Sequence, residues 1–205
     1  MYIAKSNRNE DTQELHDFIH KNGFAILVST VEGKPWATHI PLVLSKDGTK
    51  LYGHLAKGNK QWKHWSGQTE VLAIFTGPHT YISSSWYNHE NVPTWNYIAV
   101  HASGIIRIQT DEELLNSLKS LTNKYEKGSE NPVSVEKMTP GFLSKELLGI
   151  VGFEITITKL EAAYKLSQNR DDENHQRIVS ELGKRGDNDS IKIAEEMKKR
   201  RPESI

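Results

Sequence analysis

The residues from 78 to 104 combine aromatic rings, histidines and hydroxyls at a density that suits ligand binding. The segment reads PHTYISSSWYNHENVPTWNYIAVHASG, and its aromatic residues are Tyr81, Trp86, Tyr87, Trp95 and Tyr97. Aromatic rings with polar tips can hold a flat ligand and hydrogen-bond its edge. The same rings can instead pair across the strands of a β-hairpin and close a core. The residue types alone leave both interpretations open.

A second polar cluster, HLAKGNKQWK, runs from His54 to Lys63. Its pattern predicts a strand that passes Gly58 and enters a short helix flanked by three lysines. Free backbone N–H groups at a helix start, together with lysines, favour a phosphate site. Neither GxxxxGK[ST] nor GxGxxG occurs, so the pattern predicts neither a P-loop nor a Rossmann cradle. An ordinary solvated turn is the alternative.

The remaining chemistry-bearing residues favour neither a metal site nor a hydrolase. The nine histidines show no HxH or HExxH spacing, and His39, His54 and His101 fall in different predicted strands. Core or hydrogen-bonded histidines are therefore favoured, and no metal is predicted. The serines at 83–85 lie near two histidines, but no GxSxG elbow accompanies them.

A DNA-reading element would need an exposed basic helix, and the candidate is KIAEEMKKRR at residues 192–201. Two glutamates dilute its charge, and cations at a helix C-terminus are favourable in any case. We therefore expect a solvated helix end, and no DNA-binding motif such as a helix-turn-helix is recognisable.

Short strands separated by glycine-bearing turns must position these clusters. The predicted strands span residues 24–30, 36–44, 50–56, 70–76, 81–86, 97–108 and 150–160. We expect Gly77-Pro78 to end the fourth of them. This spacing predicts a mainly β, antiparallel barrel of six to seven strands, with helices on its outside.

Helix-start signals precede the predicted peripheral helices at Asp11, Asn59, Thr110 and Thr139. After residue 169 the composition becomes charged, which predicts a helical extension over residues 170–205. Its expected apolar contacts are Ile178, Leu182, Ile193 and Met197. The predicted organisation is therefore a barrel domain at 1–169, followed by a charged C-terminal helical extension at 170–205.

The composition narrows the functional classes. The 205 residues include 26 Lys plus Arg and 26 Asp plus Glu, which argues against broad attraction to nucleic acid or anionic membrane. No cysteine is present, which favours a reducing compartment. Because we recognise neither a signal peptide nor an apolar span, we expect a cytoplasmic protein without a membrane partner.

The chain resembles the PaiB family, described as FMN-binding negative transcriptional regulators and named for repression of protease synthesis and sporulation. The resemblance runs from residue 1 to about residue 169. It is carried by ATHIPLVL (37–44), GHLAKGNKQWK (53–63), GPHTYISSSWY (77–87), NVPTWNYIAVHASG (91–104), GIVGFEI (149–155) and YKLSQNR (164–170).

The resemblance implies an FMN-binding split β-barrel, the fold of pyridoxamine phosphate oxidases and flavin reductases, in which a homodimer binds two FMN molecules at its interface. It places His54, Lys57, Asn59 and Gln61 around the flavin phosphate. It places Thr38 and Pro41 beside the flavin ring, and has Trp95, Asn96 and Tyr97 approach from the partner subunit. Ser85 and Lys60 stand where relatives often have proline.

Three functions are compatible with this resemblance. The first is a homodimeric FMN-binding repressor of protease production and sporulation, acting on DNA directly or through a partner or metabolite. The alternative is a flavin-dependent oxidoreductase, either a flavin reductase or a pyridoxamine phosphate oxidase-like enzyme. The third is a flavin-storing or haem-contacting binding protein. The motifs identify no catalytic residue.

Overall fold

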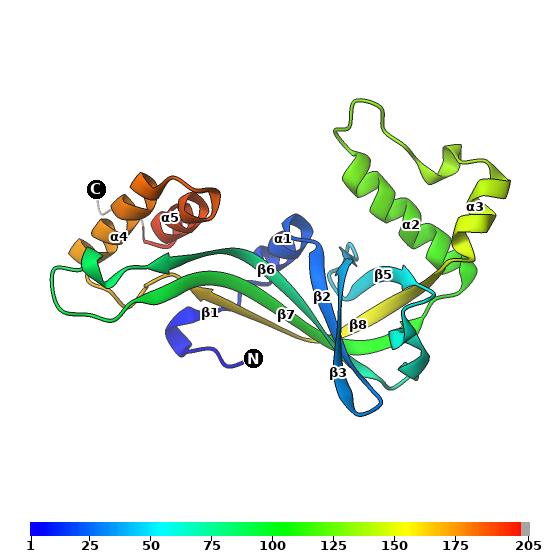
Figure 1. Cartoon of the computed structure of the whole chain (residues 1–205), viewed down its shortest axis with the longest axis horizontal. Coiled ribbons are helices and arrows are strands. Elements are labelled where there is room, and N and C mark those ends of the chain that lie inside the picture. Colours follow the sequence, from blue (N-terminus) through cyan, green and yellow to red (C-terminus); the bar gives the residue numbers. More distant parts are fainter. Residues whose placement is uncertain (202–205) are drawn as a thin grey trace. The chain divides into compact units, whose positions relative to one another are not determined.

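A computed structural model describes residues 1–201, and Figure 1 shows their helices and strands. The strands are β1 (Arg8–Asn9), β2 (Phe24–Val31), β3 (Lys34–Pro41), β4 (Val43–Leu44), β5 (Lys50–Ala56), β6 (Glu70–Ile82), β7 (Thr94–Ile108) and β8 (Ile150–Lys165). The α-helices are α1 (Thr12–Lys21), α2 (Asp111–Glu126), α3 (Pro140–Leu147), α4 (Asp172–Arg185) and α5 (Asn188–Arg200). Short 3₁₀ helices are η1 (Lys5–Asn7), η2 (Lys60–His64), η3 (Ser84–Trp86) and η4 (Val135–Lys137).

The strands form one sheet in the order β3-β2-β6-β7-β8-β5-β4, and β1 pairs with β8. The pairings of β2 with β3 and β6, of β5 with β4 and β8, and of β1 with β8 are all antiparallel. The predicted mainly β, antiparallel architecture with peripheral helices is therefore confirmed. The seven strands of the main order agree with the predicted six to seven, and the two-residue β1 is an eighth.

The chain divides into two compact units. We call residues 16–75 and 101–160 the hairpin unit, because they include the β2–β3 hairpin. We call residues 1–15, 76–100 and 161–201 the helix-pair unit, because they include α4 and α5. The long strands β6, β7 and β8 contribute residues to both units. The predicted domain boundary at residue 169 stays a prediction.

The hairpin unit is built around a tight β2–β3 hairpin. Val31 pairs with Lys34, so only Glu32 and Gly33 form the turn, and their φ angles are 51° and 76°. Two consecutive positive φ values define a turn whose twist matches that of the strands. The core of this unit consists of apolar side chains with at most 3% exposure, including Ile19, Leu27, Leu42, Leu51, Phe75, Ala102, Ile106, Phe153 and Ile155.

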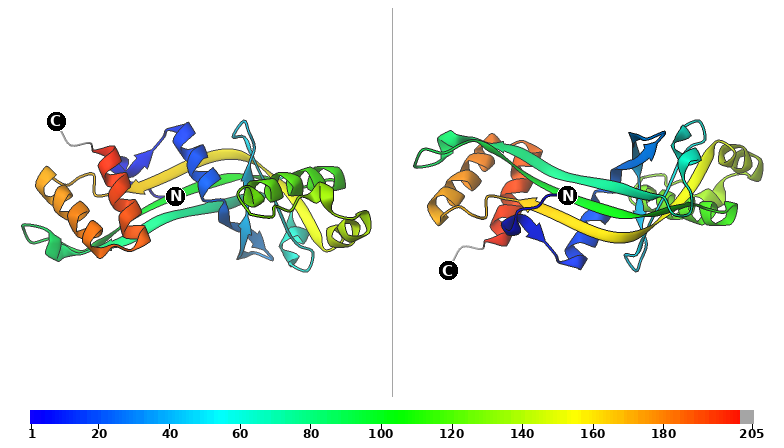
Figure 2. Two further views of the ribbon diagram at one scale, coloured as in Figure 1. Left: turned by 90° about the horizontal axis from the view of Figure 1, so that it is seen from above. Right: turned by 90° about the horizontal axis from the view of Figure 1, so that it is seen from below.

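The helix-pair unit packs α4 and α5 beside the adjoining parts of β6 and β7 (Figures 1 and 2). The four predicted apolar contacts of these helices are confirmed, because Ile178, Leu182, Ile193 and Met197 are at most 1% exposed. Thr80 of β6 and Ser190 of α5 are hydrogen-bonded through their hydroxyls at 3.0 Å. The charged composition after residue 169 therefore forms amphipathic helices with one buried face.

The other helix-start predictions are also confirmed. The Asp11 carboxylate accepts a hydrogen bond from the Glu14 amide at 3.0 Å, just before α1. Thr110 and Glu113 form a reciprocal capping box at the start of α2. Thr139 precedes α3, whose first residue is Pro140. Among residues 1–201, no helix is long and apolar enough to cross a membrane.

Two strand predictions around Gly77-Pro78 are wrong. The strand predicted to end there continues as β6 to Ile82. Only residues 72–74 of β6 pair with β2, so Pro78 lies beyond that pairing, where its missing N–H costs no ladder bond on that side. Of the strand predicted at 81–86, residues 81–82 belong to β6 and residues 84–86 form η3, because the Ser83 side chain accepts a hydrogen bond from the Ser85 amide and starts a 3₁₀ turn.

Two strand boundaries also differ from the prediction. The strand expected at 36–44 is divided into β3, which pairs with β2, and β4, which pairs with β5, so the chain changes its partner strand at Leu42. The strand expected at 150–160 extends to Lys165 as β8. Its last residues pair with β1, which is too short to show a strand pattern.

Candidate cofactor-binding site

The turn between β5 and η2 holds the predicted phosphate-site residues on an ordered backbone. The Lys57 amide donates to the Gly149 carbonyl at 2.8 Å, and the Asn59 amide donates to the Ala56 carbonyl at 2.8 Å. The Asn59 side chain accepts from the Gln61 amide at 3.1 Å and caps η2. Asn59 is therefore the predicted helix cap, and the helix that it caps is a 3₁₀ helix.

A hydrogen-bonded network anchors this turn to β2 and β3. Nδ2 of the Asn59 side chain donates to Thr38 Oγ1 at 2.9 Å, and the Thr38 hydroxyl donates to Gln61 Oε1 at 2.6 Å. Gln61 Nε2 in turn donates to Ser29 Oγ at 2.9 Å. Gln61 is fully buried, so these bonds satisfy both ends of its amide in the interior. Hydrogen bonds thus connect Thr38, Asn59 and Gln61, and the buried Gln61 side chain holds the turn in position.

The same turn carries exposed positive charge. Lys57, Lys60 and Lys63 are exposed, and in the described part of the chain none of them forms a salt bridge. Lys63 Nζ lies 5.8 Å from the centroid of the Trp62 ring. A Cβ atom added at Gly58 would meet nothing within 4 Å, so the space above the backbone there is open. Unpaired cations beside an open, ordered turn fit an anionic group.

His54 and Pro41 border this region without joining the network. His54 lies on β5 opposite Gly152 and is half-buried. Burial lowers the pKa of His54 below its ordinary value, so the ring is neutral at neutral pH and can donate or accept a hydrogen bond. Pro41 is the last residue of β3 and pairs with Phe24. The predicted ligand contacts of both residues stay predictions.

The predicted partner-subunit segment lies on β7, in the helix-pair unit. Strand alternation places Trp95 and Tyr97 on one face and Asn96 on the other. Asn96 is fully buried, and its Oδ1 accepts from the Ser167 hydroxyl at 3.0 Å. Trp95 is 51% exposed and has the rings of Tyr81 and His79 within 6.2 Å and 5.9 Å of its own. An approach to a flavin by this segment stays a prediction, and Asn96 already has interior partners.

Ser29, the last member of the network, was not predicted from the sequence as part of the site. Most residues of the strand predicted at 24–30 are apolar, but Ser29 is a polar residue at a buried position. Such a residue needs a hydrogen-bond partner, and that requirement was the available signal. The partner lies 32 residues away along the chain, and only the folded structure identifies it.

The basic end of α5 is solvated only in part: Lys198 and Lys199 are exposed, as predicted, whereas Arg200 and Arg201 are half-buried. Lys199 and Arg200 both bind the Glu14 carboxylate, at 3.1 Å and 2.6 Å. Arg201 binds Asp172 at 2.7 Å. Most of this positive charge is therefore paired within the chain.

Comparison with known proteins agrees with the observed fold. Residues 1–159 match the family model described as "Putative FMN-binding domain". The chain is 43% identical over 199 residues to "Protease synthase and sporulation protein PAI 2" of Bacillus subtilis, covering 96% of each protein. Two solved structures are similar with a TM-score of 0.62, the FAD and heme binding protein from Mycobacterium smegmatis and the flavocytochrome Anf3 from Azotobacter vinelandii.

The match to the Mycobacterium smegmatis protein covers 78% of this chain and 73% of that protein, and the match to Anf3 covers 85% of this chain and 78% of that protein. Because the sequence identities are only 16% and 15%, these structures show the fold alone. The fold is therefore that of the antiparallel FMN-binding split-barrel structures, as predicted. The chain belongs to the PaiB family, whose domain is the FMN-binding domain named above.

Proposed function

We propose that this chain binds FMN through the β5–η2 turn and acts as a homodimeric negative regulator of protease production and sporulation. The observation that carries the FMN site is the set of unpaired lysines on a turn that the Thr38–Asn59–Gln61 network holds in place. The family match and the name of the Bacillus subtilis relative support the cofactor and the biological role.

The phosphate of FMN would lie at Lys57, with Lys60 beside it and the backbone at Gly58 open to close approach. A phosphate needs cations and N–H donors, and charge-assisted hydrogen bonds supply most of its binding free energy. In this proposal Thr38 and Gln61 act as positioning residues, because their polar atoms already bond within the network. His54 would lie near the phosphate, Pro41 would border the flavin ring, and FMN would supply any redox chemistry.

The proposed homodimer is supported by the edge strand β3. Trp36 and its neighbours from Lys34 to Ala37 are exposed, so side chains on both faces of the strand meet solvent. Phe24 of the adjoining β2 is 63% exposed, and Trp36 is 41% exposed. An unpaired edge with exposed aromatic side chains is a surface that proteins usually cover. Light scattering of the purified protein should give twice the mass of one chain.

The FMN site is tested by titrating the purified protein with FMN and with riboflavin, which lacks the phosphate. We expect a flavin absorption spectrum and at least tenfold tighter binding of FMN. Equal affinity for riboflavin would show that the turn does not read the phosphate. A Soret band would instead favour the haem-contacting alternative, and NAD(P)H consumption by the loaded protein would favour the oxidoreductase alternative.

The regulatory part of the proposal is tested by a gel-shift titration against the protein's own promoter regions. Direct repression requires a saturable complex that weakens as salt rises, because phosphate contacts release counterions. If no complex forms, regulation must act through a partner or a metabolite.

A further inference from the structure

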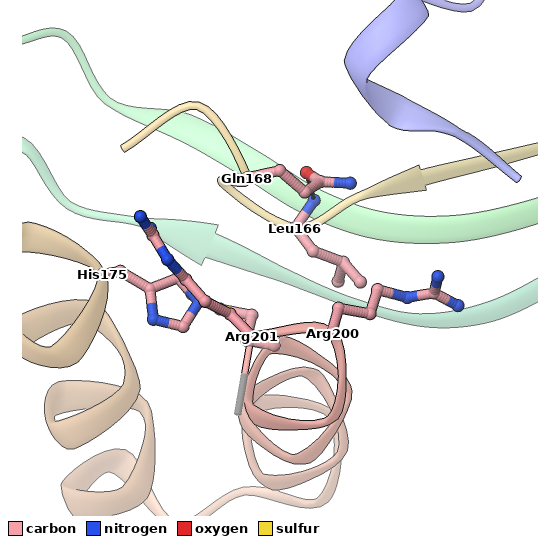
Figure 3. Close-up of a pocket in the computed structure, with 6 residues that line it drawn as sticks. Leu166, Gln168, His175, Arg200 and Arg201 are labelled. Carbon is pink, nitrogen blue, oxygen red and sulfur yellow. Dashed lines mark hydrogen bonds between the residues drawn. The ribbon is translucent and has the colours of Figure 1, made fainter. Parts of the chain in front are cut away.

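A cavity of about 190 Å³ lies among the end of β8, α4 and the end of α5 (Figure 3). Its lining residues are Leu166, Gln168, His175, Met197, Arg200 and Arg201. All six belong to the helix-pair unit, whereas the proposed phosphate turn belongs to the hairpin unit. The cavity is therefore made by residues that the FMN proposal does not use.

His175 brings an unpartnered polar ring to this cavity. The residue is only 6% exposed, and no described residue forms a hydrogen bond with its ring nitrogens. Burial lowers the pKa of His175, and the positive charge of Arg201 lowers it further, so the ring is neutral with one donor and one acceptor nitrogen. His175 lines the cavity, so its ring nitrogens are available to a ligand there.

Two arginines supply the charge of the cavity. Figure 3 shows Arg201 on the same side as the His175 ring, and Arg200 extending to the other side. Arg201 donates to the Arg170 carbonyl at 2.6 Å and pairs with Asp172, whose side chain is 81% exposed. A pair with such an exposed carboxylate contributes little, so a ligand carboxylate can replace Asp172.

Arg200 is held more firmly than Arg201. Its Nη2 binds Glu14 at 2.6 Å, and its guanidinium lies 4.2 Å from the centroid of the Tyr164 ring. Its Nε is buried and has no hydrogen-bond partner. The cavity therefore has an arginine that can exchange its partner, Arg201, and another that is fixed, Arg200.

The rest of the lining sets the size and polarity of the ligand. Leu166 and Met197 are each 1% exposed and give the cavity an apolar wall. A volume of about 190 Å³ is that of about six water molecules at ~30 Å³ each, which suits a small ligand. We propose that this cavity binds a small organic carboxylate, with its charged end on Arg201 and His175 and its short apolar chain on Leu166 and Met197.

Isothermal titration calorimetry tests this site. The purified full-length protein is titrated with sodium butyrate, and sodium chloride at matched ionic strength is the control. We expect saturable butyrate binding in the millimolar range or tighter, and weaker binding of acetate, whose apolar part is shorter. Absence of saturable butyrate binding would overturn the proposal. Equal binding of acetate and butyrate would overturn the apolar half of the assignment.

Variants locate the binding to this cavity. Arg201→Gln should weaken butyrate binding at least tenfold, and Met197→Phe should also weaken it, because the bulkier and more rigid ring narrows the cavity. Arg177→Gln is the matched control, because Arg177 lies on α4, forms a salt bridge only with Glu173 among residues 1–201 and does not line the cavity. If Met197→Phe fails to fold, Arg201→Gln decides alone: unchanged affinity in this variant would place the binding elsewhere and overturn the proposal.

Discussion

Lys57 shows how a single residue can be rigid in its backbone and free in its side chain. Its amide donates to Gly149, and its carbonyl accepts from the Trp62 indole at 3.0 Å. Both backbone groups of Lys57 are therefore engaged, while its ammonium group is exposed and has no salt bridge in the described part of the chain. A lysine whose backbone is already fixed loses less conformational entropy on binding a ligand than a lysine on a mobile loop.

Replacing Lys57 with alanine should weaken FMN binding by about 1.5–3 kcal/mol, or about 10- to 150-fold, through loss of a charge-assisted contact. Fluorescence titration with FMN measures the effect. Lys46→Ala is the matched control, because Lys46 is an exposed lysine at the opposite end of β5. Equal affinities of the two variants would place the phosphate away from the turn.

Trp95 has a different kind of freedom, because its ring is half-exposed and contacts only other rings among the contacts described above. Trp95→Ala should therefore leave the helix-pair unit folded and weaken either FMN binding or dimerisation. FMN titration and light scattering measure the two outcomes, and circular dichroism checks the fold. A folded variant that keeps both properties would contradict the predicted role of residues 95–97.

At the scale of elements, α4 contains two glycines in opposite situations. Gly183 is helical, and a Cβ atom added there would meet nothing within 4 Å. Gly186 ends the helix with a φ of 73°, in the left-handed region, and its amide donates to the Leu182 carbonyl at 3.3 Å. A side chain helps the first position and strains the second.

Gly183→Ala should therefore stabilise the protein by about 0.5–1 kcal/mol, because alanine has the higher helix propensity. Gly186→Ala should destabilise it by about 1–2 kcal/mol, because the left-handed conformation strains an alanine. Urea denaturation measures both changes, and each variant serves as the control for the other. Shifts in the same direction would contradict the assigned end of α4.

At the scale of the whole molecule, a network of charges ties β5, β7, β8 and α2 together within the hairpin unit. The buried Glu154 carboxylate binds Lys50 at 3.0 Å and Arg107 at 3.1 Å. Arg107 also binds Glu113, at 2.7 Å, at the start of α2. The hydrogen bond from Arg107, followed by the bond with the Thr110 backbone, lowers the pKa of Glu113 to about 2.

This lowered pKa predicts a pH dependence of stability. The ordinary pKa of 4.5 applies to the unfolded chain, so the contribution of Glu113 is complete above pH 4.5 and is lost as the pH falls towards about 2. The difference in the free energy of unfolding between wild type and Glu113→Gln should therefore shrink across this range in urea denaturation.

Glu112→Gln controls for this measurement, because Glu112 is an exposed carboxylate in the same helical turn and forms no salt bridge among the described residues. Its effect on the free energy of unfolding should stay nearly constant with pH. A Glu113→Gln effect that is equally flat would show that the Arg107 contact does not form in solution.

The local signals in the sequence predicted most of the elements that build this molecule. The capping residues Asp11, Asn59 and Thr110 each bond to a nearby backbone amide, so short sequence patterns are enough to identify them. The interruption at Pro78 was misjudged, because whether a proline ends a strand depends on the neighbouring strand and not on the proline alone.

The sequence by itself determined the antiparallel strands, the helix starts, the apolar faces of α4 and α5 and the family to which the chain belongs. Tertiary structure alone decided which polar groups meet: Gln61 with Ser29, Arg200 with Glu14, and His175 with the cavity beside Arg201. The physical reason is range. Caps and hydrophobic periodicity act over a few residues, whereas the Gln61–Ser29 and Arg200–Glu14 contacts join residues 32 and 186 positions apart.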